Sequence, residues 1–388
     1  MALPVLVITN AYPDFAGSYH GIFVRRIVED MAGQGWTSHV LVPRIYKKSV
    51  PKESFPSHTV TRFPFPTAGK LLIEYEKPPL IRLAVLLSSG TLAAVRLITA
   101  QKCLLIHAHW AFPAGVIGLA AARLTGRKLI LTVHGSDWRL ASTRKGPAEF
   151  LFRRVAAGSD RIISVSGIIT EYLLGQGLSR EKVITCPIGA DSRTFHREVE
   201  PDHSLDGKFA VVSTRSHLPF YRLADLVKAS ARVAEKIPGF QLVLAGEGKE
   251  TSYLKELAGQ LNLGDKVTFT GRLEPERLAR ILAASRVYVS TSPQEGSSVS
   301  LLEAMNCGCL PVVTDIPANR EWIEHGENGL LFPTGNIDAL TGSLLEAAEN
   351  SAFKEQAAQK NSRIVTEKGL WFRQIEILDK CYRSFLSN

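Results

Sequence analysis

The strongest constraint on the fold is the alternation of short strand-like runs with helical segments along the whole chain. Runs rich in β-branched and other apolar residues recur at 5–9, 38–42, 104–109, 129–133 and 161–166, and again from Phe209 onwards. Strands separated by helices pair in parallel, so the alternation predicts an α/β fold in which helices cover both faces of each sheet. Ligands of such sheets bind beyond the carboxyl ends of the strands. We therefore expect functional side chains in the loops that follow the strands.

The length of 388 residues favours two domains over one core. A polar, aperiodic stretch from Arg197 to Lys208 interrupts the alternation, which Phe209 to Arg215 restarts. We expect an N-terminal Rossmann-like domain over 1–196, a linker over 197–208 and a second Rossmann-like domain over 209–369. Residues 370–388 carry apolar side chains at helical spacing, which predicts an amphipathic helix that packs back onto the first domain.

Composition limits the compartment and the partners. Five cysteines without paired spacing indicate a reducing compartment, and we expect a cytoplasmic protein. The net charge of +9 points to an anionic partner such as a nucleotide, an acidic glycan or a membrane surface. No basic tract is interleaved with aromatic residues, so nucleic acid is not an expected partner. The uncharged runs Leu83 to Val95 and Trp110 to Ala122 are shorter than the roughly 20 residues of a membrane span, and we expect none.

The stretch SPQEGSSVSLLEAM, from Ser292 to Met305, lies between two strand-like runs at 286–290 and 310–313. A helix that is entered through Gly296 and Ser297 presents unpaired N–H groups and the positive end of its dipole, which suits phosphate. Glu295 precedes this cradle and Glu303 follows it within the helix. One carboxylate at each end suits a nucleotide-sugar, with a ribose diol for Glu303 and a sugar ring for Glu295. The alternative is that both glutamates are solvated surface charges.

This stretch, with Gly308, Pro311, Val312 and Val313 behind it, closely resembles the signature of the retaining glycosyltransferases of family 4. The resemblance implies a GT-B fold, in which two Rossmann-like domains face a central cleft. It also implies that Glu295 contacts the donor sugar, that Glu303 contacts the ribose, and that Gly296, Ser297, Ser298 and Val299 surround the phosphates. Retention of anomeric configuration follows from the resemblance alone.

Further donor contacts are implied in the second half of the chain. Arg215 matches an arginine of the family that contacts the donor phosphates, whereas Phe220 occupies the position of the family's phosphate-binding lysine. Either Arg222, two residues farther on, supplies the second charge, or the donor is held differently. The loop Gly271-Arg272-Leu273 matches one whose backbone meets the base. Ile188 replaces the usual asparagine before Gly189, which removes one expected donor-side contact.

Two strand ends in the first half carry histidines. The run Leu104 to Gly115 contains His107 and His109, and Thr132-Val133-His134-Gly135 closely resembles a family motif whose histidine lies near the reacting sugar. We expect a catalytic role for His134, and a role for His109 on the acceptor or phosphate side. Alternate histidines can also bind metal, but no third ligand is near in sequence, and a structural histidine with a backbone partner is the common alternative. Gly17 and Gly21 match a glycine loop that reaches donor and acceptor.

The sequence thus predicts a metal-independent, cofactor-free glycosyltransferase, because it has no Asp-x-Asp pair to hold a metal-bridged diphosphate. The expected partners are a UDP- or GDP-sugar and a glycan or lipid-linked acceptor, in cell-surface polysaccharide or glycoconjugate synthesis. Family acceptors are often lipid-linked, so we expect peripheral association with the inner face of the membrane. The alternatives are a nucleotide-sugar epimerase or phosphorylase on the same fold, and a silent glycan- or nucleotide-binding protein.

Overall fold

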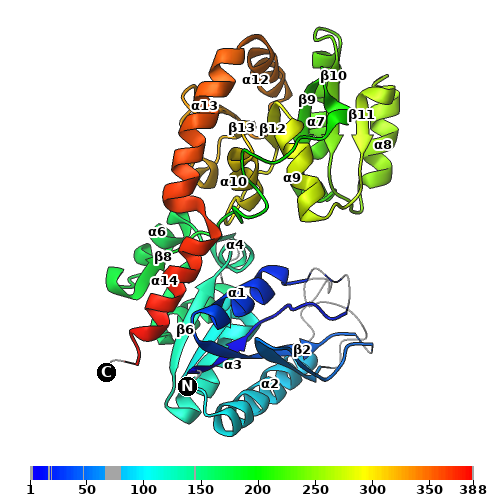
Figure 1. Ribbon diagram of the computed structural model, residues 1–388. Helices are drawn as coiled ribbons and strands as arrows, with labels where there is room; N and C mark the ends of the chain where they lie inside the picture. Colours follow the sequence, from blue (N-terminus) through cyan, green and yellow to red (C-terminus); the bar gives the residue numbers. More distant parts are fainter. Residues whose placement is uncertain are drawn as a thin grey trace. The chain divides into compact units, whose positions relative to one another are not determined.

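The structure is a computed structural model that describes residues 3–15, 18, 20–46, 48–65, 80–143 and 146–386. The chain forms two compact units, each built on its own sheet (Figure 1). The first unit comprises Met1–Cys186 and Ile375–Asn388, and the second comprises Pro187–Gln374. The predicted α/β class with two parallel-sheet domains is confirmed.

The first unit contains an eight-stranded sheet in the order β3-β4-β2-β1-β5-β6-β7-β8. Every described pairing is parallel except β3 with β4. The strands are β1 (Leu3–Ile8), β2 (Trp36–Arg44), β3 (Lys52–Ser54), β4 (His58–Pro64), β5 (Leu105–His109), β6 (Lys128–Val133), β7 (Arg161–Ser164) and β8 (Val183–Thr185). The helices are α1 (Ile22–Gly33), α2 (Leu80–Gln101), α3 (Val116–Thr125), α4 (Gly135–Thr143), α5 (Pro147–Gly158), α6 (Gly167–Gly175) and the greater part of α14 (Trp371–Arg383).

Helices cover both faces of the first sheet. α1 lies over one face and α2 over the other, with β2 between them (Figure 1). The consecutive residues Val40, Leu41 and Val42 of β2 are all buried, as expected for a strand that is covered on both sides. Trp36 of β2 contacts two residues of α14. Its Nε1 donates to Asp379 Oδ1 at 2.8 Å, and the Tyr382 ring packs edge-on against its ring. These contacts attach the C-terminal helix to the first sheet.

The second unit contains a six-stranded parallel sheet in the order β11-β10-β9-β12-β13-β14. The strands are β9 (Phe209–Ser213), β10 (Phe240–Leu244), β11 (Val267–Phe269), β12 (Val287–Ser290), β13 (Leu310–Thr314) and β14 (Leu330–Phe332). The helices are α7 (Leu223–Ala234), α8 (Thr251–Gln260), α9 (Pro275–Ala284), α10 (Val299–Asn306), α11 (Pro317–Arg320), α12 (Ile337–Glu349) and α13 (Ser351–Ile364). Alternate strand residues enter two cores, since Val211 packs with α7 and α12 whereas Ala210 and Val212 pack with α9 and α10.

The domain boundary differs from the sequence-based interpretation. Residues 197–208 belong to the second unit, where Phe195 and Leu205 are buried in its core, and the unit begins at Pro187. The Pro-rich stretch from Pro43 to Pro79 contains β3 and β4, and 66–79 lie outside the described residues. The segment around Leu330 is a strand that pairs in parallel with β13. Its three residues are too short a run to show a period.

The segment that begins the second unit runs beside the one that ends it. Ala190 pairs with Leu370 in a parallel bridge, Ala190 N donates to Gly369 O at 2.8 Å, and Trp371 N donates to Ala190 O at 2.9 Å. Gly189 lies against this pairing, and a Cβ at Gly189 would clash with the backbone of Leu370 and Trp371. Backbone atoms that are held in a bridge cannot move aside as a flexible side chain can.

We therefore expect Gly189→Ala to lower the free energy of unfolding by about 1–3 kcal/mol, the usual cost of overpacking. The control is Gly259→Ala on α8, where a Cβ meets no described atom within 4 Å. This control should gain about 0.5–1 kcal/mol from helix propensity. Urea unfolding of the full-length chain measures both changes. Equal stability of the two variants would contradict the close approach at Gly189.

Candidate functional site

The first sheet changes its direction of winding between β1 and β5. From β1 the chain proceeds outward to β2 and β4, and from β5 it proceeds the other way to β6, β7 and β8. Loops at such a switch point diverge and leave room for a ligand. The loops that follow β1 and β5 are joined there by Asn10, whose Nδ2 donates to Phe112 O at 2.8 Å and whose Oδ1 accepts from Ala114 N at 3.0 Å. Sequence reasoning did not identify Asn10.

Three histidines are buried next to this switch point. His109 Nδ1 lies 3.2 Å from His134 Nε2, and the two rings are stacked. His107 lies behind them, 2.6 Å from both Thr132 Oγ1 and the Tyr382 hydroxyl. His109 Nε2 is buried without a hydrogen-bond partner among the described residues. The structure thus brings His109 and His134 together, and each has a side-chain partner where the structural alternative expected a backbone partner. A role of either histidine in a reaction stays a prediction.

Aromatic rings lie against the histidine pair. Phe23 of α1 and Trp110 of the loop after β5 lie with ring centroids 5.1 and 4.6 Å from that of His134. Trp110 has a φ of 70°, a strained conformation for a residue with a side chain. Its Nε1 donates to Ser136 Oγ at 3.1 Å, which ties the loop after β5 to the start of α4. Strain of this kind is concentrated at functional sites.

Burial makes these histidines neutral. Burial lowers the pKa of His109 to about 3 and places the pKa values of His107 and His134 well below their usual range. Asp137 in the first turn of α4 shows the opposite effect, because burial raises its pKa to about 7 although it accepts from Ala111 N and Trp138 N. Asp137 fastens the loop after β5 to the loop after β6, and sequence reasoning missed it.

The glycine loop is described only in part. Gly17 lies outside the described residues. Gly21 has a φ of 67° and directly precedes α1, and a Cβ there would clash with the backbone of Ala11. Glycine is therefore required where the loop after β1 folds back on itself. A role of Gly17 and Gly21 toward a ligand stays a prediction.

The second sheet has its own switch point, between β9 and β12. Arg215 follows β9 and Glu295 follows β12, so the two residues flank this point. Arg215 Nη2 lies 2.7 Å from Glu295 Oε1, and only 10% and 9% of the two side chains are exposed. Arg215 Nε also donates to Ser290 Oγ at 3.3 Å. The guanidinium and carboxylate that sequence reasoning assigned to diphosphate and sugar are thus neighbours.

The ion pair is close but not aligned as a hydrogen bond. Within the described part of the chain, Arg215 Nη2 and Glu295 Oε1 both lack a partner at hydrogen-bonding angles, and so do the buried hydroxyls of Ser213 and Ser292 at the same edge. Burial alone would lower the pKa of Arg215. The charges of Tyr288, Glu295, Tyr221 and Glu303 outweigh burial, so the pKa lies above its usual value. Arg215 is therefore a permanent cation with unused N–H bonds. Buried polar groups without partners are rare, and their concentration makes this edge a candidate ligand site.

The start of α10 lies beside this pair. Ser298 occupies the N-cap position, but its hydroxyl donates to Asn319 Oδ1 at 2.9 Å and does not cap the helix. Ser297 Oγ donates to Ile188 O at 3.4 Å. The first N–H groups of α10 are thus not satisfied by the Ser298 side chain. Glu303 lies within the same helix, near enough for its charge to raise the pKa of Arg215.

Two predicted donor contacts lie farther from the ion pair. Arg222 has a φ of 53°, directly precedes α7 and donates from Nε to Asp225 Oδ2 at 2.8 Å. Its guanidinium is thus already paired at the surface, and its use as a second phosphate ligand stays a prediction. The loop Gly271-Arg272-Leu273 follows β11, at the same edge of the sheet and two strands from β9. Buried His217, which was not predicted, positions the loop after β9, since its Nδ1 lies 2.9 Å from Thr251 Oγ1.

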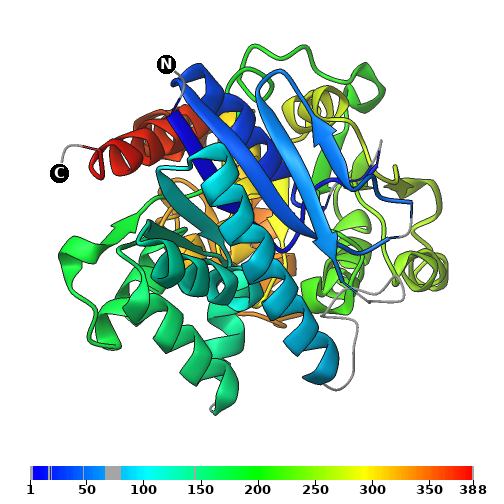
Figure 2. The ribbon, with the colours of Figure 1, turned by 90° about the horizontal axis from the view of Figure 1, so that it is seen from below.

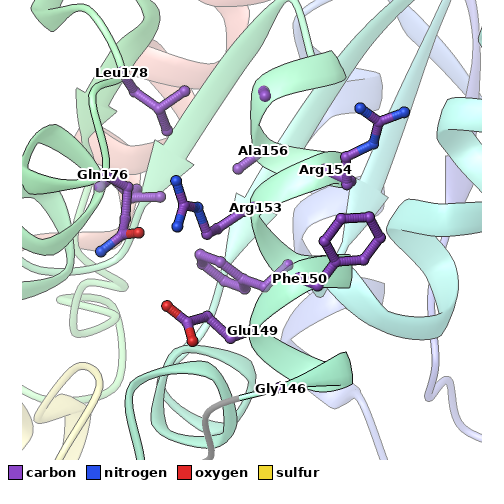
Figure 3. Close-up of a pocket in the computed structure, with 11 residues that line it drawn as sticks. Gly146, Glu149, Phe150, Arg153, Arg154, Ala156, Gln176 and Leu178 are labelled. Atoms are coloured by element: carbon purple, nitrogen blue, oxygen red, sulfur yellow. The ribbon is translucent and has the colours of Figure 1, made fainter.

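A separate hollow of about 480 Å³ lies between α5 and α6 of the first unit (Figure 3). Phe150, Phe152, Arg153, Leu173 and Leu178 contribute to its lining. Its lining contains none of the three histidines discussed above, and its arginines extend from one helix, α5. Since its described lining lacks convergent buried polar groups, we do not assign the activity to it.

The buried histidines predict a pH dependence of stability. Unfolded histidines gain protons below about pH 6.5, whereas His107, His109 and His134 stay neutral in the folded chain, so the unfolding free energy falls with decreasing pH. Asp137 cancels the proton uptake of one histidine, because it keeps its proton up to about pH 7 in the folded chain and releases it on unfolding. Between pH 5 and 6, unfolding should take up a net of about two protons from these groups.

His109→Gln should reduce this uptake by about one proton, or about 1.4 kcal/mol per pH unit. Gly259→Ala on α8, which changes no titratable group, is the control and should leave the pH slope unchanged. Urea unfolding between pH 5 and 7 provides the measurement. A slope that His109→Gln leaves intact would show that His109 is charged in the folded chain.

Comparisons with known proteins agree with this geometry. The family described as Glycosyl transferases group 1 matches residues 197–364, and the one described as Glycosyl transferase 4-like domain matches residues 20–189. N-acetyl-alpha-D-glucosaminyl L-malate synthase of Bacillus anthracis is 22% identical over 71% of this chain and 72% of its own length. Putative glycosyltransferase EpsF of Bacillus subtilis is 30% identical over 54% of this chain and 57% of its own length. The chain thus spans little more than half of some relatives that it matches.

Solved structures show the same fold. Sucrose-phosphate synthase of Thermosynechococcus elongatus superimposes with a TM-score of 0.83 at 20% identity, over 99% of both chains. HepE of Anabaena, solved with UDP, has a TM-score of 0.74 at 18% identity, over 98% of this chain and 100% of its own. These neighbours have the GT-B fold of two parallel-sheet domains. The chain is a member of the group 1 glycosyltransferases, family 4, with the GT-B fold.

Proposed function

We propose that this protein transfers a sugar from a nucleotide-sugar donor to a glycan or lipid-linked acceptor with retention of anomeric configuration. The observation that carries the proposal is the Arg215–Glu295 pair at the β9/β12 switch point, with its unused hydrogen-bonding atoms. In this proposal the second unit mainly binds the donor and the first unit mainly binds the acceptor, with His134 near the reacting sugar. The product serves in cell-surface polysaccharide or glycoconjugate synthesis.

The proposed donor is a UDP-sugar, with a GDP-sugar as the alternative. Support comes from neighbours that were solved with UDP, with UDP-glucose, or with UDP and GlcNAc. Glu303 on α10 would hold the ribose diol, the backbone of Gly271, Arg272 and Leu273 would meet the base, and Ser297 to Val299 would supply amides to the phosphates. Glu295 would contact the sugar.

A lipid-linked acceptor is supported by one relative. A phosphatidylinositol N-acetylglucosaminyltransferase chain of Arabidopsis thaliana is 28% identical over 58% of this chain and 51% of its own length. The name of that protein describes transfer of N-acetylglucosamine to a lipid. We therefore propose a cytoplasmic enzyme that associates peripherally with the inner face of the membrane.

The proposed chemistry follows from where charge develops. The bond from the anomeric carbon to the diphosphate breaks, and negative charge grows on the leaving diphosphate. The acceptor oxygen bonds to the anomeric carbon, and its proton passes to an oxygen of the leaving diphosphate. Arg215 and the first amides of α10 would stabilise this charge, and a single preorganised donor of this kind is typically worth about 3 kcal/mol. The proposal needs no metal, so EDTA should leave the transfer rate unchanged. Anomeric coupling constants of the product, measured by NMR, test retention.

We expect UDP- or GDP-sugars to raise the thermal unfolding midpoint, because a ligand that binds only the folded chain stabilises it by mass action. The free nucleotide should be released faster when an acceptor is present, as transfer requires and epimerisation does not. No shift with any nucleotide-sugar, together with no turnover in cell extract, would instead favour a silent binding protein.

The two glutamates should separate binding from turnover. Glu303→Ala should raise the dissociation constant of the donor about tenfold, since a hydrogen bond to a charged group contributes about 1.5–3 kcal/mol. Glu295→Gln should lower kcat by about a hundredfold with a smaller effect on donor binding, because it removes the charge beside the sugar. The control is Glu327→Gln, at an exposed position of the same unit. Wild-type rates in both site variants would reject the assignment.

A further inference from the structure

α2 has two chemically distinct faces. Its inner face consists of Leu86, Gly90, Ala94 and Ile98, which are buried at a spacing of four residues. Gly90 fits closely, because a Cβ there would lie 2.6 Å from Ile117 of α3 and 3.0 Å from Phe63 of β4. α2 is long and apolar enough to cross a membrane by length and composition. Its inner face, however, is part of the sheet's cover, so spanning would require the first unit to come apart.

The outer face of α2 is apolar and exposed. We define it as Ile81, Val85, Ser88, Leu92 and Arg96, which recur at helical spacing opposite the buried face. Ile81 is 82% exposed and Leu92 is 51% exposed. Figure 2 shows α2 on the near side of the first sheet, with no other described helix or strand of that unit in front of it. Soluble surfaces rarely leave such a stripe uncovered.

Charge near this face has one sign. α2 contains Arg82 and Arg96 and no acidic residue. The whole first unit has 25 Lys and Arg against 13 Asp and Glu, a net charge of +12, whereas the second unit has 21 against 24, a net charge of −3. The excess positive charge of the protein therefore resides entirely in the unit that carries the apolar stripe.

We propose that the outer face of α2 is a docking surface for an anionic lipid bilayer, which deepens the peripheral membrane association of the proposed function and rests on it. Apolar side chains on a helix that lies in the interface enter the acyl boundary, while basic residues meet anionic headgroups. α2 combines both features. A protein groove with an acidic rim would also pair with the two arginines of α2, but it would not use the positive charge on the rest of the unit. The negative surface potential of an anionic bilayer attracts the whole positively charged unit.

Co-sedimentation of the full-length chain with vesicles tests the proposal without donor, acceptor or turnover. Wild type should bind vesicles of phosphatidylcholine mixed with phosphatidylglycerol, and should bind vesicles of phosphatidylcholine alone more weakly. The double variant Ile81→Ser with Leu92→Ser should lower the affinity for anionic vesicles by about tenfold or more. Arg96→Gln should lower it by about fivefold at low salt and less at high salt.

The matched control is Tyr253→Ser, which removes a large side chain that is 47% exposed on α8 of the acidic unit. It should bind vesicles like wild type. Unchanged thermal unfolding of each variant shows that the fold is intact. Wild-type vesicle binding by the double variant, or no preference of wild type for anionic lipid, would overturn the proposal. So would a wild-type dimer that the double variant makes monomeric without any effect on lipid, because the face would then join two copies of the chain. Loss of transfer with vesicle binding intact would count against the proposed function alone.

Discussion

The second unit depends on the burial of two opposite charges at one sheet edge. Taking Arg215 and Glu295 out of water costs several kcal/mol for each charge, and their mutual attraction repays this only when other groups complete the shell. Here the shell is incomplete among the described residues, since the facing atoms are 2.7 Å apart but not aligned as a hydrogen bond. A fold under selection for stability alone would gain by replacing the pair with apolar residues. The pair is therefore better explained by a ligand that completes its hydrogen bonds, which a diphosphate and a sugar hydroxyl would do.

In the first unit, by contrast, the buried titratable groups beside the switch point are neutral. Burial keeps the pKa values of His107, His109 and His134 below their usual range and raises that of Asp137 to about 7. Neutral imidazoles can donate or accept a hydrogen bond without adding a cation beside a developing oxocarbenium-like carbon. In the proposed reaction, the second unit would thus supply a fixed positive charge for the leaving group. The first unit would supply neutral hydrogen-bonding groups for the sugar and the acceptor.

Much of this arrangement could be predicted from the sequence because it depends on local pattern. Strand and helix periodicity predicted both sheets, and the glycine-serine turn after Glu295 predicted the start of α10. That this turn holds phosphate stays a prediction. What could not be predicted depends on contacts between distant segments. Asn10 bonds to residues about a hundred positions away, across a switch point that only the strand order reveals. The start of the second unit at Pro187 is set by the backbone pairing of Ala190 with Leu370, which leaves no sequence signature.

Phe220, in the place of the family's phosphate-binding lysine, changes how the proposed donor site can work. Tyr221 beside it is held by Thr291 Oγ1, which donates to its carbonyl at 2.6 Å, and the Arg215 guanidinium lies 5.5 Å from the Tyr221 ring. Arg222 is engaged by Asp225. The phosphate charge would thus fall on one buried guanidinium and the amides of α10. Backbone amides cannot be replaced by substitution, and a buried cation is screened little by salt. Donor affinity in this chain should therefore depend on the geometry of the α10 turn more than on the number of basic side chains, which explains how the site can dispense with the lysine.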